Sequence, residues 1–350
     1  MKRRTFVAAT TSLIVAPWIN RASAQQPVSI NVMAYTGLFQ DRYMAAVVEP
    51  FMRANPGIRV NYSPLPNSAA MIGQLRAQRT APQVDVVILD VTVAKVGTDE
   101  GIFSRLEASA IPEINELYPN ARFPNVGGVA ITFDNLVMIY NTEAVKPPPT
   151  SLLDMATAAM RGRVAIPGLP DIQGMSLVMI LDKLNGGPGV EGRFAKGIEA
   201  MAAIAPNVQT WEPRPDVYAP IINGQAAIGI GWNARAQVNA DTSSGKLGAL
   251  IPKEGTVFQI NVINQVQGSP QAQAAQRFIS YALSAPAQKA FTESMFYAPT
   301  NSKADIAPSA IDRTAVKFMD RVVPVDWIAV AAVRDQIMDQ WRRRVIPLSR

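Results

Sequence analysis

Residues 220–262 read PIINGQAAIGIGWNARAQVNADTSSGKLGALIPKEGTVFQINV, and this stretch decides the predicted fold. Residues 226–231 are small and apolar, carry no charge and are too few for a helix, so they predict a strand buried on both faces of a sheet. Trp232 ends this strand, and Asn233 is expected to cap a helix that begins near Ala234. Because ligands of open α/β sheets bind where strands end and helices begin, Trp232 is placed to contact a ligand.

The flanking segments predict two lobes joined by crossing strands. Residues 28–34, 41–54 and 58–62 have the pattern of a βαβ unit, and Ser68 is expected to cap the helix that follows. We interpret residues 120–141 as the first passage into a second lobe and residues 256–262 as a strand that crosses back. The expected fold is therefore an α/β fold with two lobes, each a mixed sheet flanked by helices. The expected lobes comprise residues 28–126 with 262–300, and residues 127–261 with 301–350.

The composition argues against most enzyme classes. The 350 residues include no Cys and no His, which removes disulfides, thiolate chemistry and the commonest general base and metal ligand. Patterns of a nucleophile elbow or an HExxH metal site do not occur either. We therefore expect neither catalysis nor a bound cofactor or metal.

The first 24 residues have the pattern of an export signal. Residues 2–4 are basic, residues 6–19 are mildly apolar, and Ala22-Ser23-Ala24 is a small-residue cleavage site, so the mature protein is expected in the periplasm. Arg3-Arg4 fits a twin-arginine signal, but Lys2 stands where a hydroxyl residue is usual, so Sec export stays open. Cleavage after Ala24 removes four of the 33 basic residues and leaves 29 against 27 acidic ones. A net charge of +2 gives no support for nucleic-acid binding.

Several segments, taken in order, resemble one protein family. They are FMRANPGIRV (51–60), VDVVILD (84–90), VMIYN (137–141), NGQAAIGIGWNA (223–234), IPKEG (251–255), AQRFISYALSAPAQKAF (275–291) and YAPTN (297–301). This series resembles the periplasmic solute-binding proteins of bacterial ABC transporters, in the spermidine/putrescine-binding-like group. The resemblance implies two α/β lobes that close on a ligand like a hinge. It also implies a permease and ATPase complex as partners, and we expect a monomer.

The same resemblance implies a set of ligand-binding positions. Polyamine-binding members combine aromatic walls with carboxylates, which suit alkylammonium groups. The corresponding residues here are Tyr35, Thr36, Asp90, Thr92, Asp171, Trp232, Gln259 and Asn261. Two acids and a tryptophan of the family pattern are replaced here, by Gly174, Asn261 and Gln259, while Asp90 is gained. A smaller or less cationic ligand than spermidine is therefore expected.

Arg235 adds a position that suits an anion. It lies one helical turn beyond Trp232, near a helix N-terminus, where the dipole and free N–H groups favour negative charge. Together with Asp171 or Asp90, it suits the two ends of a zwitterion such as an amino acid. Trp211 and Tyr218 lie in a proline-rich loop and suit a rim or lid. The iron-binding relatives need adjacent tyrosines, and this chain has no Tyr-Tyr pair.

Other interpretations remain open at this point. Trp232 also suits a core position, Asp90 and Asp171 suit helix N-caps, and Arg235 suits a solvated helix face. The main functional hypothesis is a receptor that captures a small polar solute, a polyamine-like amine or a zwitterion, and delivers it to an ABC permease. The alternatives are an exported hydrolase and a receptor that feeds a chemosensor.

Overall fold

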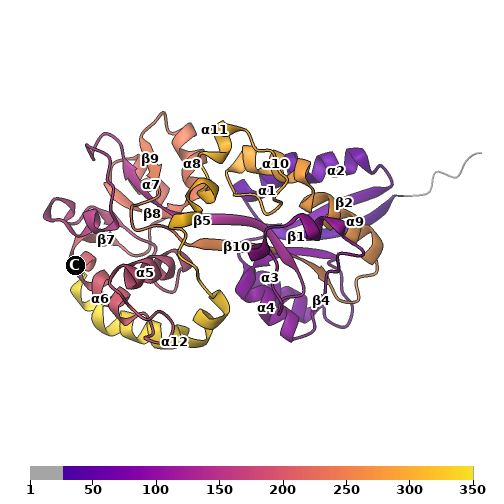
Figure 1. Cartoon of the computed structure of the whole chain (residues 1–350), viewed down its shortest axis with the longest axis horizontal. Coiled ribbons are helices and arrows are strands. Elements are labelled where there is room, and N and C mark those ends of the chain that lie inside the picture. The colour runs from indigo at the N-terminus through magenta and orange to yellow at the C-terminus, as the bar shows by residue number, and fades with distance from the viewer. Residues whose placement is uncertain (1–26, 350) are drawn as a thin grey trace, which may run out of the picture.

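The structure, a computed structural model, describes residues 27–349; the predicted export signal therefore lies outside the described residues. It consists of two α/β lobes side by side, with strands β5 and β10 running between them (Figure 1). The strands are β1 (Val28–Tyr35), β2 (Ile58–Leu65), β3 (Val86–Asp90), β4 (Phe103–Ser104), β5 (Val129–Asn141), β6 (Val164–Ala165), β7 (Val208–Thr210), β8 (Ile228–Trp232), β9 (Leu247–Leu250) and β10 (Phe258–Val266). The predicted two-lobed fold is thus confirmed.

Helices surround these strands. They are α1 (Leu38–Tyr43), α2 (Glu49–Ala54), α3 (Ser68–Ala77), α4 (Val91–Asp99), α5 (Ile172–Leu184), α6 (Ala195–Ile204), α7 (Tyr218–Ile222), α8 (Asn233–Thr242), α9 (Ala272–Leu283), α10 (Ala285–Met295), α11 (Pro308–Ile311) and α12 (Trp327–Arg344). A π turn over Met44–Val48 joins α1 to α2, just before Pro50. Proline has no N–H for the helix ladder, and the chain accommodates this by widening the preceding turn.

The order of the strands explains how two lobes share one sheet. Neighbouring strands follow the order β2-β1-β3-β10-β5-β8-β6-β7, with β4 paired to β10 and β9 paired to β5. The first half of β5 pairs with β10, and its second half pairs with β8 and β9. β5 and β10 therefore form the connection across which the lobes meet. The predicted crossing strand at 256–262 corresponds to the first part of β10.

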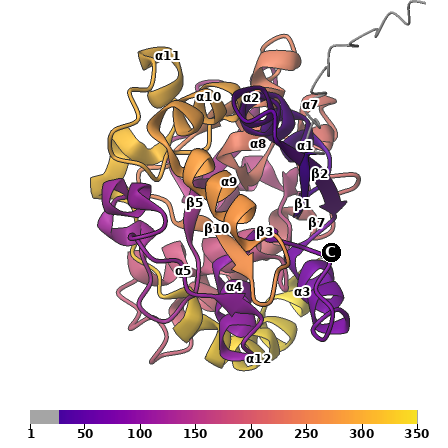
Figure 2. The same ribbon diagram turned by 90° about the vertical axis from the view of Figure 1, so that its right-hand side faces the viewer.

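The first lobe is packed on both faces of its sheet. Along β3, Val86 and Ile88 belong to the same core cluster as residues of α1, α2 and α9, while Val87 and Leu89 belong to a cluster with residues of α3 and α4. Figure 2 shows these two helical layers on opposite sides of β1 and β3. Because strand side chains alternate between faces, a strand buried on both sides has a continuous apolar sequence. The run VVIL of β3 has this pattern.

Two of the expected helix caps are wrong in detail. Asn67, not Ser68, caps α3, because its Oδ1 accepts a hydrogen bond of 2.9 Å from the Ala70 N–H. The helix expected after Trp232 begins at Asn233, whose side chain turns away to donate to the carbonyl oxygen of Arg313 at 2.7 Å. The N–H of Ala234 is bound instead by Asp134 of β5, at 3.0 Å. A cap supplied from a distant strand cannot be read from the local sequence.

Candidate functional site

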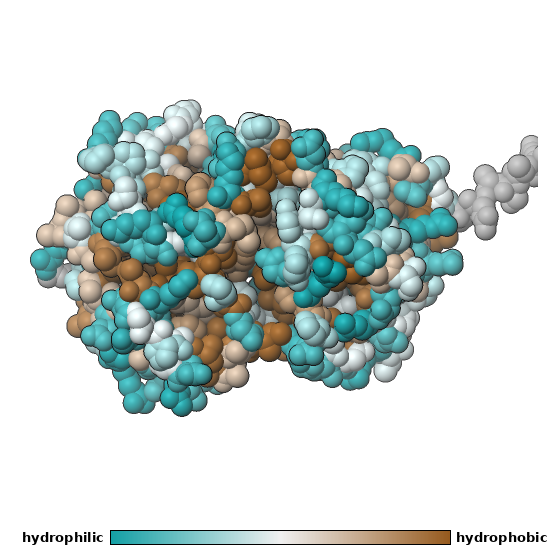
Figure 3. Space-filling view, in the orientation of Figure 1, coloured by the Kyte–Doolittle hydropathy of each residue, from teal (hydrophilic) through white to brown (hydrophobic). Residues whose placement is uncertain are grey.

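A cavity of about 520 Å³ lies between the lobes. Figure 3 shows that the molecule narrows between the two lobes and that apolar surface is concentrated near this region. Seven of the nine predicted ligand-binding residues line the cavity: Tyr35, Asp90, Thr92, Asp171, Trp232, Arg235 and Gln259. They come from the ends of β1, β3 and β8, from the starts of α4, α5 and α8, and from β10. The structure thus brings together residues that are spread over more than two hundred positions of the chain.

A hydrogen-bonded chain fixes the aromatic ring that ends β1. The Tyr35 hydroxyl donates to Oδ1 of Asn261 at 3.0 Å, so the 2.9 Å contact with Ser68 must be donated by the Ser68 hydroxyl. Asn261 is itself fixed, since its Nδ2 donates to Oγ1 of Thr132 at 2.9 Å. Asn261 is 1% exposed and does not line the cavity. In this structure it therefore lies behind Tyr35 and holds the ring.

Asp90 both caps a helix and faces the cavity. Its Oδ1 accepts from the backbone N–H and from the hydroxyl of Thr92, at 2.9 and 2.7 Å, and so caps α4. Its Oδ2 has no hydrogen bond within residues 27–349. Burial raises the pKa of Asp90, and the two hydrogen bonds from Thr92 oppose this shift without cancelling it. Asp90 is thus an N-cap, as one interpretation of the sequence expected, and it also lines the cavity.

Asp171 and Gln173 bring polar groups from the second lobe. Oδ1 of Asp171 accepts from the Gln173 N–H at 2.7 Å and caps α5, while the residue remains exposed. Oε1 of Gln173 is buried and has no hydrogen-bond partner within the described residues. A buried hydrogen-bond acceptor without a partner is costly, so a ligand that donates a hydrogen bond to this oxygen would remove that cost.

Trp232 belongs to the core and to the cavity wall. Only 4% of it is exposed, it packs in a core cluster that includes residues of both lobes, and its carbonyl oxygen accepts from the Tyr218 hydroxyl at 2.9 Å. It ends β8 opposite Leu136 of β5. The core position that the sequence left open is therefore confirmed, and the ligand contact stays a prediction.

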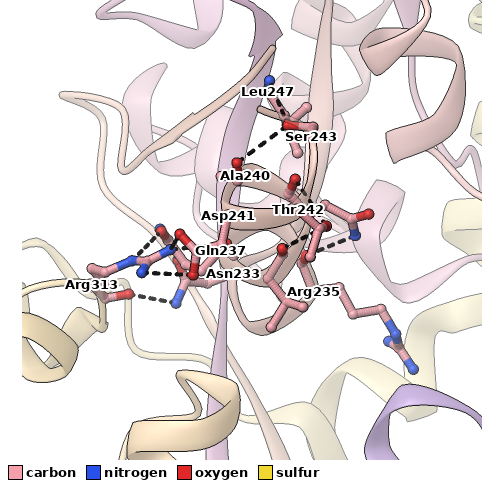
Figure 4. Close-up of polar contacts among 11 residues, drawn as sticks. Asn233, Arg235, Gln237, Ala240, Asp241, Thr242, Ser243, Leu247 and Arg313 are labelled. Carbon is pink, nitrogen blue, oxygen red and sulfur yellow. Dashed lines mark hydrogen bonds and ion pairs between the residues drawn. The ribbon is translucent and has the colours of Figure 1, made fainter. Parts of the chain in front are cut away.

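Arg235 is a cation with no partner among residues 27–349. It lies on the first turn of α8, and its side chain extends away from that helix (Figure 4). Within the part of the chain that the structure describes, its guanidinium makes no hydrogen bond or ion pair. Nearby Arg313, in contrast, is bound to Gln237 and Asp241 by several hydrogen bonds. A partly buried, unpaired guanidinium beside a cavity is suited to bind an anionic group.

Two sets of residues differ from the expectation. Thr36 does not line the cavity; it is exposed, and its N–H donates to the carbonyl oxygen of Leu65 at 3.1 Å. The sequence reasoning missed a wall contributed by α12, formed by Trp327, Val330, Ala331 and Arg334. Their spacing of i, i+3, i+4 and i+7 indicates one helix face. Nothing local indicates that this face lies on the cavity.

Two further observations bear on the class of protein. Within residues 27–349 there is no group of three or more acidic side chains placed to hold a metal ion. Among the described helices, none has both the length and the apolar character needed to cross a membrane.

Residues 46–317 match the family model of the bacterial extracellular solute-binding proteins. The chain belongs to this family. It is 24% identical over 296 residues to the gamma-aminobutyric acid-binding protein of Pseudomonas aeruginosa, covering 80% of this chain and 79% of the relative. It is 21% identical over 308 residues to the spermidine/putrescine-binding periplasmic protein 1 of Haemophilus influenzae, covering 86% and 84%.

Solved structures share the fold of this solute-binding protein. An extracellular solute-binding protein of Bordetella parapertussis superposes with a TM-score of 0.77 at 20% identity, covering 91% of this chain and 98% of that one. A GABA receptor superposes with a TM-score of 0.73 at 21% identity, covering 90% and 96%. The protein is therefore a solute-binding component of ABC transport for small solutes, and it works outside the cytoplasm with a permease and an ATPase. The family is non-enzymatic, so the hydrolase alternative is not supported.

Proposed function

We propose that this protein captures a small zwitterion, with one ammonium and one carboxylate group, and delivers it to its permease. The observation that carries the proposal is the unpaired guanidinium of Arg235 in the same cavity as the carboxylate of Asp90. Burial of an unpaired charge is costly, and a ligand carboxylate would offset that cost. A ligand with only cationic groups would leave Arg235 unpaired and would be repelled by it.

The charge of Asp90 and the neighbouring aromatic rings support binding of the ligand's ammonium group near the first lobe. Burial and the charge of Asp90 raise the pKa of Tyr35, whereas the charge of Arg235 lowers it, so both charges act on the same hydroxyl. Oδ2 of Asp90 is available to an ammonium group. The Trp232 ring suits the alkyl chain of the ligand or a cation–π contact. Asp171, Thr92 and Gln259 complete the proposed polar wall.

The two relatives named above bind ligands that can be compared with the proposed zwitterion. One is a gamma-aminobutyric acid-binding protein, and that ligand carries one ammonium and one carboxylate group. Another is a spermidine/putrescine-binding protein, whose ligands carry only amines. Arg235 favours the first class for this chain. Thr36 and Asn261 enter the proposal only as supports, since neither lines the cavity.

The remaining parts of the proposal concern context. We infer that the mature protein is a periplasmic monomer, released by cleavage after Ala24, and that it uses no cofactor. We also infer lobe boundaries near residues 126/127, 261/262 and 300/301. A receptor that feeds a chemosensor would use the same cavity. Deletion of the permease gene distinguishes the two roles: it abolishes uptake in a transport system, whereas taxis toward the ligand survives the deletion only if the protein also serves a sensor.

Four ligands with the same four-carbon chain test the proposal: 4-aminobutanoate, 1-aminobutane, butanoate and 1,4-diaminobutane. Isothermal titration calorimetry with the mature protein should give the tightest binding for 4-aminobutanoate. Each missing charged hydrogen bond is expected to cost about 1.5–3 kcal/mol, which is roughly ten- to hundredfold in Kd. Binding of the diamine as tightly as the zwitterion, or no binding of any of the four, would overturn the assignment.

A further inference from the structure

A second cavity, of about 620 Å³, adjoins the interlobe cavity. The two share five lining residues: Pro170, Asp171, Gln173, Trp232 and Arg235. All other lining residues of the second cavity come from residues 167–169, 211–218, 341 and 346, which belong to the second lobe. It therefore needs no closure of the lobes to form. We call it the side chamber.

The side chamber has an aromatic wall. Of the five tryptophans in the chain, Trp211, Trp232 and Trp341 line it. The rings of Trp211 and Trp341 meet edge to face, with their centroids 4.7 Å apart. Gly168 permits this arrangement, because a Cβ at that position would lie 3.1–3.2 Å from both tryptophans. The aromatic wall of the side chamber is thus formed by closely packed side chains.

Most polar side chains of the side chamber are already satisfied. Nε1 of Trp211 donates to Oγ of Ser349 at 2.7 Å, and the Tyr218 hydroxyl donates to the carbonyl oxygen of Trp232. Oδ1 of Asp216 accepts from the N–H groups of Tyr218 and Ala219 at the start of α7. Two groups that have no partner within residues 27–349, the guanidinium of Arg235 and Oε1 of Gln173, lie where the two cavities join.

We propose that the side chamber is a subsite for an apolar or aromatic substituent of the ligand, whose charged groups bind at the junction and in the interlobe cavity. The inference rests on the proposed function, and it narrows the substrate class to amino acids that carry such a substituent. Two of the charged residues that line the chamber, Glu212 and Arg214, pair with each other at 3.5 Å. An aromatic wall favours an apolar or aromatic occupant.

The test compares 4-aminobutanoate with 4-amino-3-phenylbutanoate by calorimetry. Burial of the phenyl ring should make the second compound bind roughly tenfold more tightly to the wild-type protein. Ile346→Trp is designed to fill the side chamber with a larger side chain. Ile346 is 41% exposed, and of the two cavities it lines only the side chamber. It should reduce the affinity for the phenyl compound by roughly tenfold and leave the Kd of 4-aminobutanoate within about twofold.

Leu348→Trp is the matched control, because Leu348 is 48% exposed on the same short helix and lines neither the interlobe cavity nor the side chamber. It should change neither affinity. A wild-type protein without preference for the phenyl compound, or an Ile346→Trp variant that keeps this preference or weakens both ligands equally, overturns the side chamber alone. If the wild-type protein binds neither compound, the proposed function fails together with it.

Discussion

Oδ1 of Asp134 accepts a hydrogen bond of 3.0 Å from the backbone N–H of Ala234, although the two residues lie one hundred positions apart. The crossing strand β5 thereby holds the first turn of α8, which carries Arg235 beside Trp232. The other oxygen of Asp134 is buried and has no hydrogen-bond partner within residues 27–349. Burial raises the pKa of this carboxyl from 3.8 to about 7.

The raised pKa of Asp134 predicts a pH-dependent stability. Between about pH 4 and pH 7 the unfolded chain has already lost this proton while the folded protein keeps it, so the free energy of unfolding falls as pH rises. Asp134→Asn has no proton to lose. The Tm of the variant, measured by calorimetry, should therefore rise relative to that of the wild type as the pH increases from 5 to 8. Asp99→Asn, at an exposed position, serves as the control, and a constant difference for Asp134→Asn would refute the assignment.

Asp90→Asn should weaken ammonium binding while keeping the cap of α4. The amide oxygen still accepts from Thr92, but the charge near the ligand is lost. We expect the affinity for 4-aminobutanoate to fall by about 1.5–3 kcal/mol, with little change in Tm. Butanoate, which has no ammonium group, should bind no worse than to the wild type. Equal losses for both ligands would show that Asp90 acts through the fold and not through the ammonium.

In the wild-type protein, binding of 4-aminobutanoate should weaken as the pH falls. Burial raises the pKa of Asp90, so its ionised form is depleted at a higher pH than for an exposed aspartate. Calorimetric titrations of 4-aminobutanoate between pH 8 and pH 5 should show a rising Kd. The Asp90→Asn variant should show a smaller rise over the same range. An identical pH profile in both proteins would remove Asp90 from the binding equilibrium.

Trp232→Ala should reduce both stability and affinity, because this side chain is 4% exposed and also lines both cavities. Truncation of a buried tryptophan costs about 3–5 kcal/mol of stability. Loss of an aromatic anchor costs up to about 2–4 kcal/mol of binding. Trp232→Phe keeps more of the packing and should separate the two effects, with a smaller drop in Tm. Unchanged ligand affinity in both variants would exclude the ring from the site.

Ligand binding should close the lobes and stabilise the protein. The cavity wall formed by α12 contacts α4 of the first lobe, so a ligand held between them links the two lobes. At a ligand concentration of one hundred times Kd, mass action adds about 2.7 kcal/mol to the free energy of unfolding. Small-angle scattering should show a smaller radius of gyration with ligand than without it. An unchanged radius at saturation would argue against hinge closure.

The sequence predicted what local pattern determines. The buried strand that ends in IGIGW was recognisable by its apolar run, and its end located Trp232 at the sheet edge, whereas Asp90 was indicated by the family resemblance. Contacts between distant segments were not recognisable. Asp134 as the cap of α8, Ser68 beside Tyr35, and the wall from Trp327 all depend on tertiary packing. Residues whose role is set by such packing carry no local signal.

The most direct test of the central claim measures the preference of the protein for a zwitterion over an amine. Calorimetry of 4-aminobutanoate and 1-aminobutane with wild-type protein and Arg235→Gln gives four affinities and one coupling energy. We predict a preference of roughly tenfold or more for the zwitterion in the wild-type protein and its near loss in the Arg235→Gln variant. A preference that survives Arg235→Gln would contradict the assignment of Arg235 to the ligand carboxylate.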